Sequence, residues 1–321
     1  MSIVFNVEAY GSEARTSATA DFFELVALTG RILTPEGIAD FLGDAAVLLR
    51  RDRYTLDVTG QEDDESDMEG RPIVVPGDDP AGPAREAARR VLGLLEQRAR
   101  ILGDRYPFSL DNVSFRVLNR RRAASSAYAA LLAIATAHAY SVDVGIRVTD
   151  AFEDTVARAV RRRIARTSAF GVLRRSHGSF AAALEAVGHD LLLPTTTVGV
   201  VLSSAIKDGG ADTLSHLDWG DDRKGRWTFV GQVTCARSDA WEGKANEAGR
   251  GRWRDLLGDL LAPQAFLAVP HHVEDLMIQR LVQDTQSLVL DRLRLVPHLT
   301  KLSTDERRIA RGVLAATVEY Q

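Results

Sequence analysis

Apolar residues recur at helical spacing through much of the N-terminal part of the chain. The pattern predicts two short helices within residues 19–49, the first ending at Gly30 and the second opening on Thr34 as its N-cap. An amphipathic helix of roughly five turns follows over residues 84–104. Residues 125–142 predict a further helix, which is apolar on nearly every side and therefore buried. The two short helices around a glycine-containing turn fit a helix-turn-helix at residues 19–49, and they also fit a plain helical hairpin.

A polar segment interrupts these helices. Residues 50–58 have the composition of a β-strand. Residues 61–70 carry six acids and no base, and residues 75–83 are rich in Pro and Gly. Both of the latter stretches are typical of exposed loops.

From about residue 142 helical and strand patterns alternate, and no internal repeat is present. The predicted elements are helices over residues 150–165 and 179–191, strands over 226–235 and 264–270, and a closing helix over 274–299. Asp150 is the expected N-cap of the first helix. The pattern predicts an α/β domain with a small mixed sheet over residues 142–321, preceded by a mostly helical region over residues 1–141.

Composition limits the class of protein. The chain has 321 residues, 45% hydrophobic and 26% charged, as in a folded globular protein with one large or two smaller domains. No run of about 18 uncharged apolar residues is present, and the first residues lack the features of a signal peptide, so we expect a cytoplasmic protein with no membrane partner. The chain has one cysteine, Cys235, which excludes an internal disulfide and a thiolate zinc cluster. We expect Cys235 to be a small, buried apolar residue.

Charge is unevenly distributed along the chain. The formal net charge is −4, which is not that of a protein coated with phosphate-binding side chains. Residues 151–175 nevertheless contain seven arginines against two acids, and a second basic group occupies residues 119–122. The run is either a solvated helix face or an anion-binding strip. The candidate nucleic-acid-binding residues of such a strip are Arg161, Arg162, Arg163 and Arg166.

Three oxygen-bearing side chains follow one another through the second half in a fixed order. Glu153 lies on a predicted helix, Asp212 ends the turn Asp208-Gly209-Gly210-Ala211-Asp212 at the start of a strand, and Gln232 lies within the next strand. Mg²⁺ prefers octahedral oxygen coordination and keeps several waters, so such side chains could converge on one hard cation. Each also has a plainer explanation. Glu153 could be there simply because an acid near a helix N-terminus interacts favourably with the helix dipole. Asp212 could be a turn residue, and Gln232 could point outward from its strand.

The order of these residues resembles the PD-(D/E)xK restriction-endonuclease-like superfamily, especially the Mrr-like nucleases of bacterial restriction systems. The matching residues are Phe152-Glu153, the turn 208–212 and Gln232-Val233-Thr234, within about residues 145–245. The resemblance implies a restriction-endonuclease-like mixed sheet flanked by helices. It implies a nuclease that cleaves DNA with Mg²⁺ or Mn²⁺ in bacterial defence, as a homo-oligomer, with partner defence proteins. It also implies that Asp212 is the principal metal ligand, Gln232 the second, and Glu153 an auxiliary acid.

The chain departs from the superfamily pattern at one position. Thr234 stands where the pattern has a lysine, which would help to activate the attacking water and stabilise charge on the phosphate. Arg237 and Lys244, just downstream, are the candidate replacements. Two alternatives remain open. The chain could be a catalytically degenerate relative that binds nucleic acid or a partner protein, or the Asp-Gly-Gly turn could be structural only, with Asp212 and Gln232 far apart.

Other chemistry-bearing residues have weaker signals. Adjacent histidines on a strand point to opposite faces, so we expect His271 and His272 at the surface of a strand end rather than in one metal site. We expect Trp241 and Trp253 in the core, although they could also stack on bases while nearby arginines bind phosphates. His216 is expected to be a hydrogen-bonded structural residue. The chain has no phosphate-binding loop of the P-loop type, so ATP-driven chemistry is not supported.

Overall fold

The computed structural model describes residues 2–44, 82–111, 113–164, 166–197, 209–217, 219–221 and 223–320. The predicted strand over 50–58, the acidic stretch 61–70 and Asp208 lie outside these residues. Within the described ranges, no helix is long and apolar enough to cross a membrane.

The N-terminal part is mainly helical, with three short strands. Its elements are β1 (Ser2–Val4), α1 (Arg15–Leu28), α2 (Pro35–Asp44), α3 (Gly82–Leu102), β2 (Phe108–Leu110), β3 (Phe115–Val117), α4 (Arg120–Ala124) and α5 (Ala127–Ala139). The predicted helices are all found, and the Thr34 hydroxyl accepts a hydrogen bond from the Gly37 amide (3.0 Å) at the start of α2. As predicted, α5 is buried along nearly its whole length.

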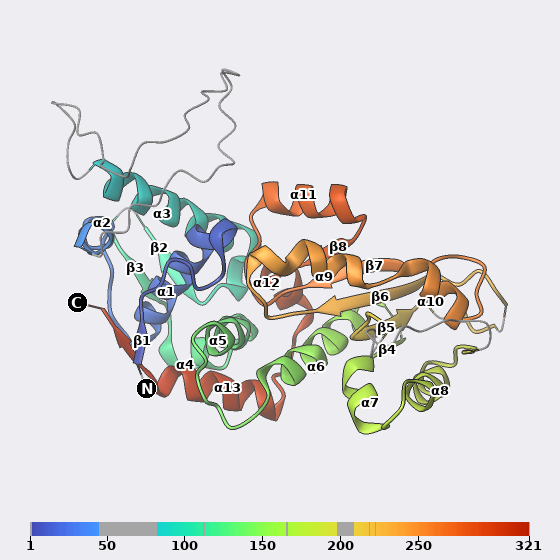
Figure 1. Ribbon diagram of the computed structural model, residues 1–321. Coiled ribbons are helices and arrows are strands. Elements are labelled where there is room, and N and C mark those ends of the chain that lie inside the picture. Colours follow the sequence, from blue (N-terminus) through green and yellow to red (C-terminus); the bar gives the residue numbers. More distant parts are fainter. Residues whose placement is uncertain are drawn as a thin grey trace, which may run out of the picture.

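The remaining elements include a five-stranded sheet with helices around it (Figure 1). They are α6 (Val148–Arg161), β4 (Arg166–Ser168), α7 (Phe170–Ser176), α8 (Phe180–Leu191), β5 (Thr213–His216), β6 (Thr228–Val233), α9 (Trp241–Glu247), α10 (Arg250–Leu256), β7 (Gln264–Ala268), α11 (Asp275–Thr285), β8 (Leu288–Leu290), α12 (Arg292–Leu295), α13 (Thr304–Ala315) and β9 (Thr317–Glu319). The strand order is β4-β5-β6-β7-β8. Neighbours from β4 to β6 are antiparallel, and those from β6 to β8 are parallel. The predicted mixed sheet is thereby confirmed.

Two expectations for these elements are wrong. The N-cap of α6 is Arg147, not Asp150, which lies in the first turn. Instead, a guanidinium nitrogen of Arg175 lies 3.0 Å from the Asp150 carboxylate. Local sequence does not reveal this ion pair. The closing segment 274–299 is not one helix, because Gln286 adopts a left-handed conformation (φ 53°) that ends α11 and lets β8 join the sheet.

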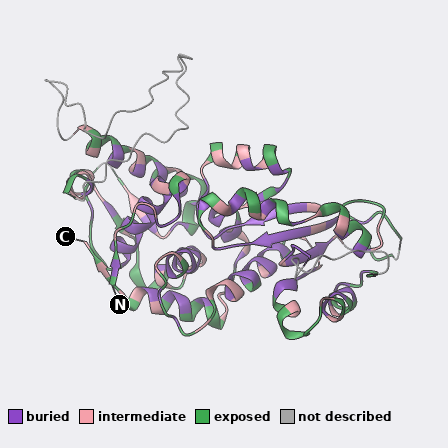
Figure 2. Cartoon of the chain, in the orientation of Figure 1, coloured by how far each residue is buried: buried purple, intermediate pink, exposed green. Residues whose placement is uncertain are grey.

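Alternate residues of the central strands enter cores on the two faces of the sheet. Val233, Phe266 and Ala268 pack in the main apolar core, which also holds Phe152 of α6. On the other face Ala265 packs with residues of α8 and α10. The strands are therefore buried on both sides (Figure 2), as the apolar density of residues 226–235 predicts.

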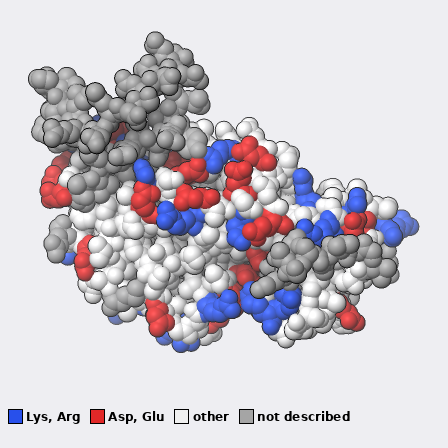
Figure 3. Space-filling view, viewed as in Figure 1, with Lys and Arg blue, Asp and Glu red and all other residues white. Residues whose placement is uncertain are grey.

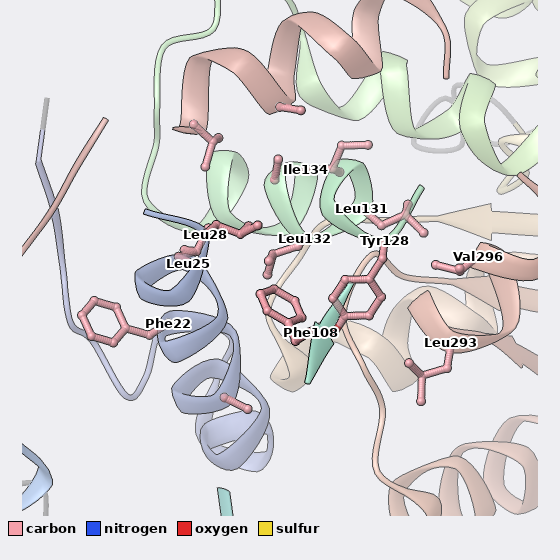
Figure 4. Packing of buried hydrophobic residues seen from close by; sticks show 14 of the residues in the cluster. Phe22, Leu25, Leu28, Phe108, Tyr128, Leu131, Leu132, Ile134, Leu293 and Val296 are labelled. Atoms are coloured by element: carbon pink, nitrogen blue, oxygen red, sulfur yellow. The ribbon is translucent and has the colours of Figure 1, made fainter. Parts of the chain in front are cut away.

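The main apolar core extends across the predicted boundary between residues 141 and 142. Phe22 of α1 and Leu132 of α5 share it with Leu293 of α12 and Val296 (Figure 4). The first and last strands, β1 and β9, also pair in parallel, so the two ends of the described chain lie together (Figure 1). The division into residues 1–141 and 142–321 stays a prediction, but the two parts fold around shared apolar surface.

Four charged side chains are fully buried where these parts meet. A guanidinium nitrogen of Arg98 on α3 lies 2.7 Å from Asp21 and 2.9 Å from Glu24, both on α1. Arg292 of α12 donates to Asp21 Oδ1 at 2.8 Å. Burial opposes the ionisation of Asp21, but the two arginines outweigh it and hold its pKa well below the usual range. Buried charges of both signs thus tie α1 to α3 and α12.

Tyrosines complete this buried polar cluster. The hydroxyl groups of Tyr106 and Tyr128 donate to Glu24 Oε1 at 2.6 and 2.7 Å. Burial raises the pKa of Glu24, and Arg98 works against that rise. The carboxylate is stable there only because its oxygen atoms are hydrogen-bonded and paired.

We expect Arg98→Met to destabilise the protein by about 3–5 kcal/mol, because it leaves two carboxylates buried without one of their counter-ions. Arg100→Met changes an exposed arginine on the same helix and should cost less than about 0.5 kcal/mol. Urea unfolding followed by circular dichroism measures both. Equal small losses for the two variants would show that the cluster contributes no such stability.

Candidate functional site

The two glycines before Asp212 are required by close packing. Gly209 and Gly210 have φ of 66° and 71°. A Cβ on Gly210 would lie 2.0 Å from the carbonyl oxygen of Glu247 at the end of α9. The Gly209 carbonyl accepts hydrogen bonds from the side chains of Arg252 and Trp253, each at 2.9 Å. The turn is therefore held against α9 and α10. It fixes the position of Asp212, which directly precedes β5.

The carboxylate of Asp212 lies against the neighbouring strand. Its Oδ2 accepts a hydrogen bond from the Val233 amide at 2.8 Å. Its backbone carbonyl accepts from the Gly171 amide of α7 at 2.9 Å. Residue 212 thus adjoins the end of β6, where Gln232 lies, and the hypothesis that the two residues are far apart is wrong.

Glu153 meets Asp212 at Gly171. A Cβ placed on Gly171 would lie 2.5 Å from Oε2 of Glu153 and 3.2 Å from Oδ1 of Asp212. Both carboxylate oxygens therefore lie close against Gly171, and a side chain at this position would displace them. The structure brings together an acid from α6 and an acid from the start of β5, as the order of these residues predicts.

Arg175 of α7 provides the positive charge of this site. Its two terminal nitrogens donate to the two carboxylate oxygens of Glu153 at 3.1 and 2.9 Å. Asp212 also acts electrostatically on the Arg175 guanidinium. On the face shown in Figure 3, basic and acidic side chains gather where α6 and α7 meet. Sequence analysis missed Arg175, because its distance of 22 residues from Glu153 corresponds to no motif.

Burial sets the ionisation of the acid on α6. Glu153 is only 5% exposed, and burial raises its pKa, while Arg175 acts in the opposite direction. Cys235 is also buried, and burial together with the charge of Glu153 raises the pKa of its thiol. Cys235 is therefore a protonated, unreactive side chain beside the site, as its apolar strand predicts.

Gln232 lies near the end of β6, and Thr234 directly follows that strand. Gln232 is buried and pairs with Leu267 of β7. Strand alternation places its side chain on the same face as Val230, whereas Val233 faces the core of α6. The hydroxyl of Thr234 accepts a hydrogen bond from the Ala236 amide at 3.0 Å, so it caps a local turn.

The two candidate replacements for the missing lysine bind acids of their own segments. The Arg237 guanidinium lies 3.4 Å from Asp239, and the Lys244 ammonium lies 2.9 Å from Glu247. Glu247 ends the helix that packs on Gly210, so Lys244 lies one helical turn from that contact. Arg175, rather than these two residues, contacts Glu153, and Asp212 acts on it electrostatically.

The basic run follows α6 to its end. Arg161 donates to the Thr167 carbonyl at 2.7 Å, and Arg162 donates to the Thr300 hydroxyl at 3.4 Å. Arg163 acts electrostatically on His298. Arg166 lies on β4, paired with His216. The four residues therefore do not form one strip, because the chain turns after α6 and returns as the edge strand.

The helix pair at residues 19–49 is described only as far as Asp44. α1 is buried at every position from Thr16 to Leu28. The exposed residues of α2 include Glu36, Asp40 and Asp44, and this acidic surface would repel phosphate. The helix-turn-helix stays a prediction, and its visible surface does not favour DNA.

The expectation for the paired histidines is wrong, because His271 and His272 are both buried. The ring of His271 lies 4.2 Å from that of Tyr10, and burial lowers the pKa of His271 to about 3. His272 accepts a hydrogen bond from Arg98 at 3.2 Å. The N-terminal segment covers this strand end, a contact that sequence spacing cannot reveal. Trp241 and Trp253 are core residues, as expected.

Comparison with known proteins gives no relative. No protein-family model, no curated protein and no solved structure matches the chain. Among the described residues, no group of three or more His, Cys, Asp and Glu side chains is arranged to hold a metal ion.

We expect Gly171→Ala to destabilise the protein by about 1–3 kcal/mol, because the new Cβ would overlap the Glu153 carboxylate. Gly243 is the matched control, since it lies near the start of another seven-residue helix with nothing within 4 Å of an added Cβ. Gly243→Ala should be neutral or stabilising by up to about 1 kcal/mol. Thermal unfolding of both variants measures the difference, and similar behaviour would contradict the close approach at Gly171.

Proposed function

We propose that this protein is a metal-dependent nuclease that hydrolyses phosphodiester bonds of DNA in bacterial defence, with a restriction-endonuclease-like fold. The observation that carries the proposal is that the carboxylates of Glu153 and Asp212 both lie close to Gly171. A mixed sheet flanked by helices, with Asp212 directly before β5 and Gln232 on the neighbouring β6, agrees with what the PD-(D/E)xK resemblance implies.

The residues present fit a Mg²⁺ or Mn²⁺ ion. Magnesium in proteins is commonly held by only one or two carboxylates and completes its coordination with water and substrate oxygen atoms. Asp212 and Glu153 would hold the ion. The PD-(D/E)xK resemblance also implies Gln232 as a ligand, but its side chain lies on the face of Val230, opposite to the core of α6. A carboxylate has about four lone-pair sites, so Glu153 can accept the hydrogen bonds from Arg175 and still bind a cation. A divalent ion there would supply a Lewis acid for phosphodiester hydrolysis.

The protein's own groups would prepare the site. The Val233 amide fixes one oxygen of Asp212 and so orients the other toward Gly171. Arg175 supplies the fixed positive charge that Thr234 cannot, and guanidinium groups suit phosphate oxygen atoms. Because arginine does not lose its proton near neutral pH, Arg175 would stabilise charge and not act as a base.

A second candidate function is a catalytically inactive nuclease-like subunit that binds nucleic acid or a partner protein. It is favoured by Thr234 and by the contact of Arg175 with both oxygens of Glu153, which neutralises that carboxylate without a metal. The two functions differ in one measurable respect, since only the nuclease requires a divalent cation that depends on Asp212.

We expect the purified protein to bind Mn²⁺ and to nick or linearise plasmid DNA with Mg²⁺ or Mn²⁺. Asp212→Ala should abolish the calorimetric heat of Mn²⁺ binding and reduce cleavage by about 100-fold or more. Asp104→Ala removes an exposed acid and should leave both unchanged. Unchanged cleavage by Asp212→Ala would exclude the assigned site, and absence of Mn²⁺ binding by the wild type would favour the inactive subunit.

The pH dependence of metal binding should report on Arg175. Burial raises the pKa of Glu153 and Arg175 lowers it, so Arg175→Gln should let the carboxyl stay protonated to a higher pH. Metal binding needs the carboxylate, and the pH of half-maximal Mn²⁺ binding should therefore move upward. Arg121→Gln, which changes an exposed arginine of α4, should not move it. A shift to lower pH, or none, would contradict the electrostatic role given to Arg175.

A further inference from the structure

A basic cavity lies at the end of α6, apart from the acid pair. Its volume is about 340 Å³, at the lower end of the range of small-ligand pockets. The lining residues are Arg158, Arg161, Arg162, His298, Leu299, Thr300 and Lys301. No acid lines this cavity, although the chain as a whole has a net charge of −4.

Positive charge in this cavity is largely uncompensated. Arg161 and Arg162 bind a carbonyl and a hydroxyl group, and in the described ranges neither they nor Lys301 form an ion pair. Arg158 is the exception, because it pairs with Asp154 and Glu306.

Further cations act on His298, which lines this cavity. Burial lowers the pKa of His298, and the charges of Arg163, Arg162 and Arg105 lower it further. Arg105 acts on His298 from a segment remote in sequence, so the fold itself brings positive charges together here. Holding like charges together without acids is unfavourable unless an anion joins them.

We propose that this cavity binds a phosphate monoester, namely the terminal phosphate of a nucleic-acid strand or that of a free mononucleotide. A monoester carries about −1.5 to −2 charges at neutral pH, more than a backbone diester, and offers three acceptor oxygens to several donors. Arg161, Arg162 and Lys301 supply the cationic donors, and the Thr300 hydroxyl supplies a neutral one.

The cavity has a defined position relative to the acid pair. Arg161 and Arg162 follow Glu153 by eight and nine residues on α6 and its C-cap, which corresponds to roughly 12–14 Å along the axis. A strand anchored by its terminal phosphate would then present an internal phosphodiester, a few nucleotides away, to Glu153 and Asp212. This consequence for cleavage rests on the proposed function, whereas phosphate binding does not.

The test is carried out in EDTA, so that it does not depend on the metal site. Fluorescence anisotropy compares a short single-stranded oligonucleotide with a 5′-phosphate, the same strand with a 3′-phosphate, and the same strand with hydroxyl groups at both ends. Adenosine monophosphate and inorganic phosphate serve as competitors. The variants are Arg162→Gln combined with Lys301→Gln, the control Arg121→Gln, and Asp212→Ala.

We expect a terminal phosphate at one end to tighten binding by about 10-fold or more, and the double variant to lose this difference. Arg121→Gln and Asp212→Ala should keep it. Weak competition by adenosine monophosphate would show that the ligand is the strand end. If adenosine monophosphate competes as well as the phosphorylated strand, the ligand is a free mononucleotide, and the proposed monoester site is still supported. Equal affinity for all strands, or a phosphate effect that survives the double variant, would overturn the proposal. Failure of the nuclease assignment would show separately, as cleavage or Mn²⁺ binding that does not depend on Asp212.

Discussion

The buried cluster of Asp21, Glu24, Arg98 and Arg292 is the constraint on which the arrangement of the two parts depends. Each of these charges is stable away from water only while its partners stay in place, so α1, α3 and α12 are held in one relative position. Apolar packing alone would tolerate small sliding of these helices. Because α12 directly follows β8, the cluster also fixes one edge of the sheet against the N-terminal helices.

The acid pair depends on a different constraint, which is the absence of side chains. Gly210 allows α9 to approach the turn before Asp212, and Gly171 lets the carboxylates of Glu153 and Asp212 approach the backbone of α7. At both positions a Cβ would displace atoms that define the site. Close approach and positive φ thus explain why the turn contains two glycines, where ordinary turn chemistry would need only one.

The sequence predicted the elements better than their contacts. Local periodicity located α3, α5, α8 and β6, and the order of Glu153, Asp212 and Gln232 predicted that acids from a helix and a strand would meet. Arg175, Gly171 and the burial of His271 could not be predicted in this way, because each depends on a contact between segments remote in sequence. Asp150 shows the same limit, since an ion pair with Arg175, and not a cap, determines its position.

The charges of the two sites on α6 are complementary in a way that a nucleic acid would require. Near its start, α6 presents an acid whose burial opposes ionisation and which already pairs with the Arg175 guanidinium. At its other end, arginines without acidic partners would be stabilised by an anion. Under the proposed function, a phosphate chain with a divalent cation would bring charges of both signs to these two ends of one helix. The net charge of −4 is then no objection, because the binding charge is concentrated and not spread over the surface.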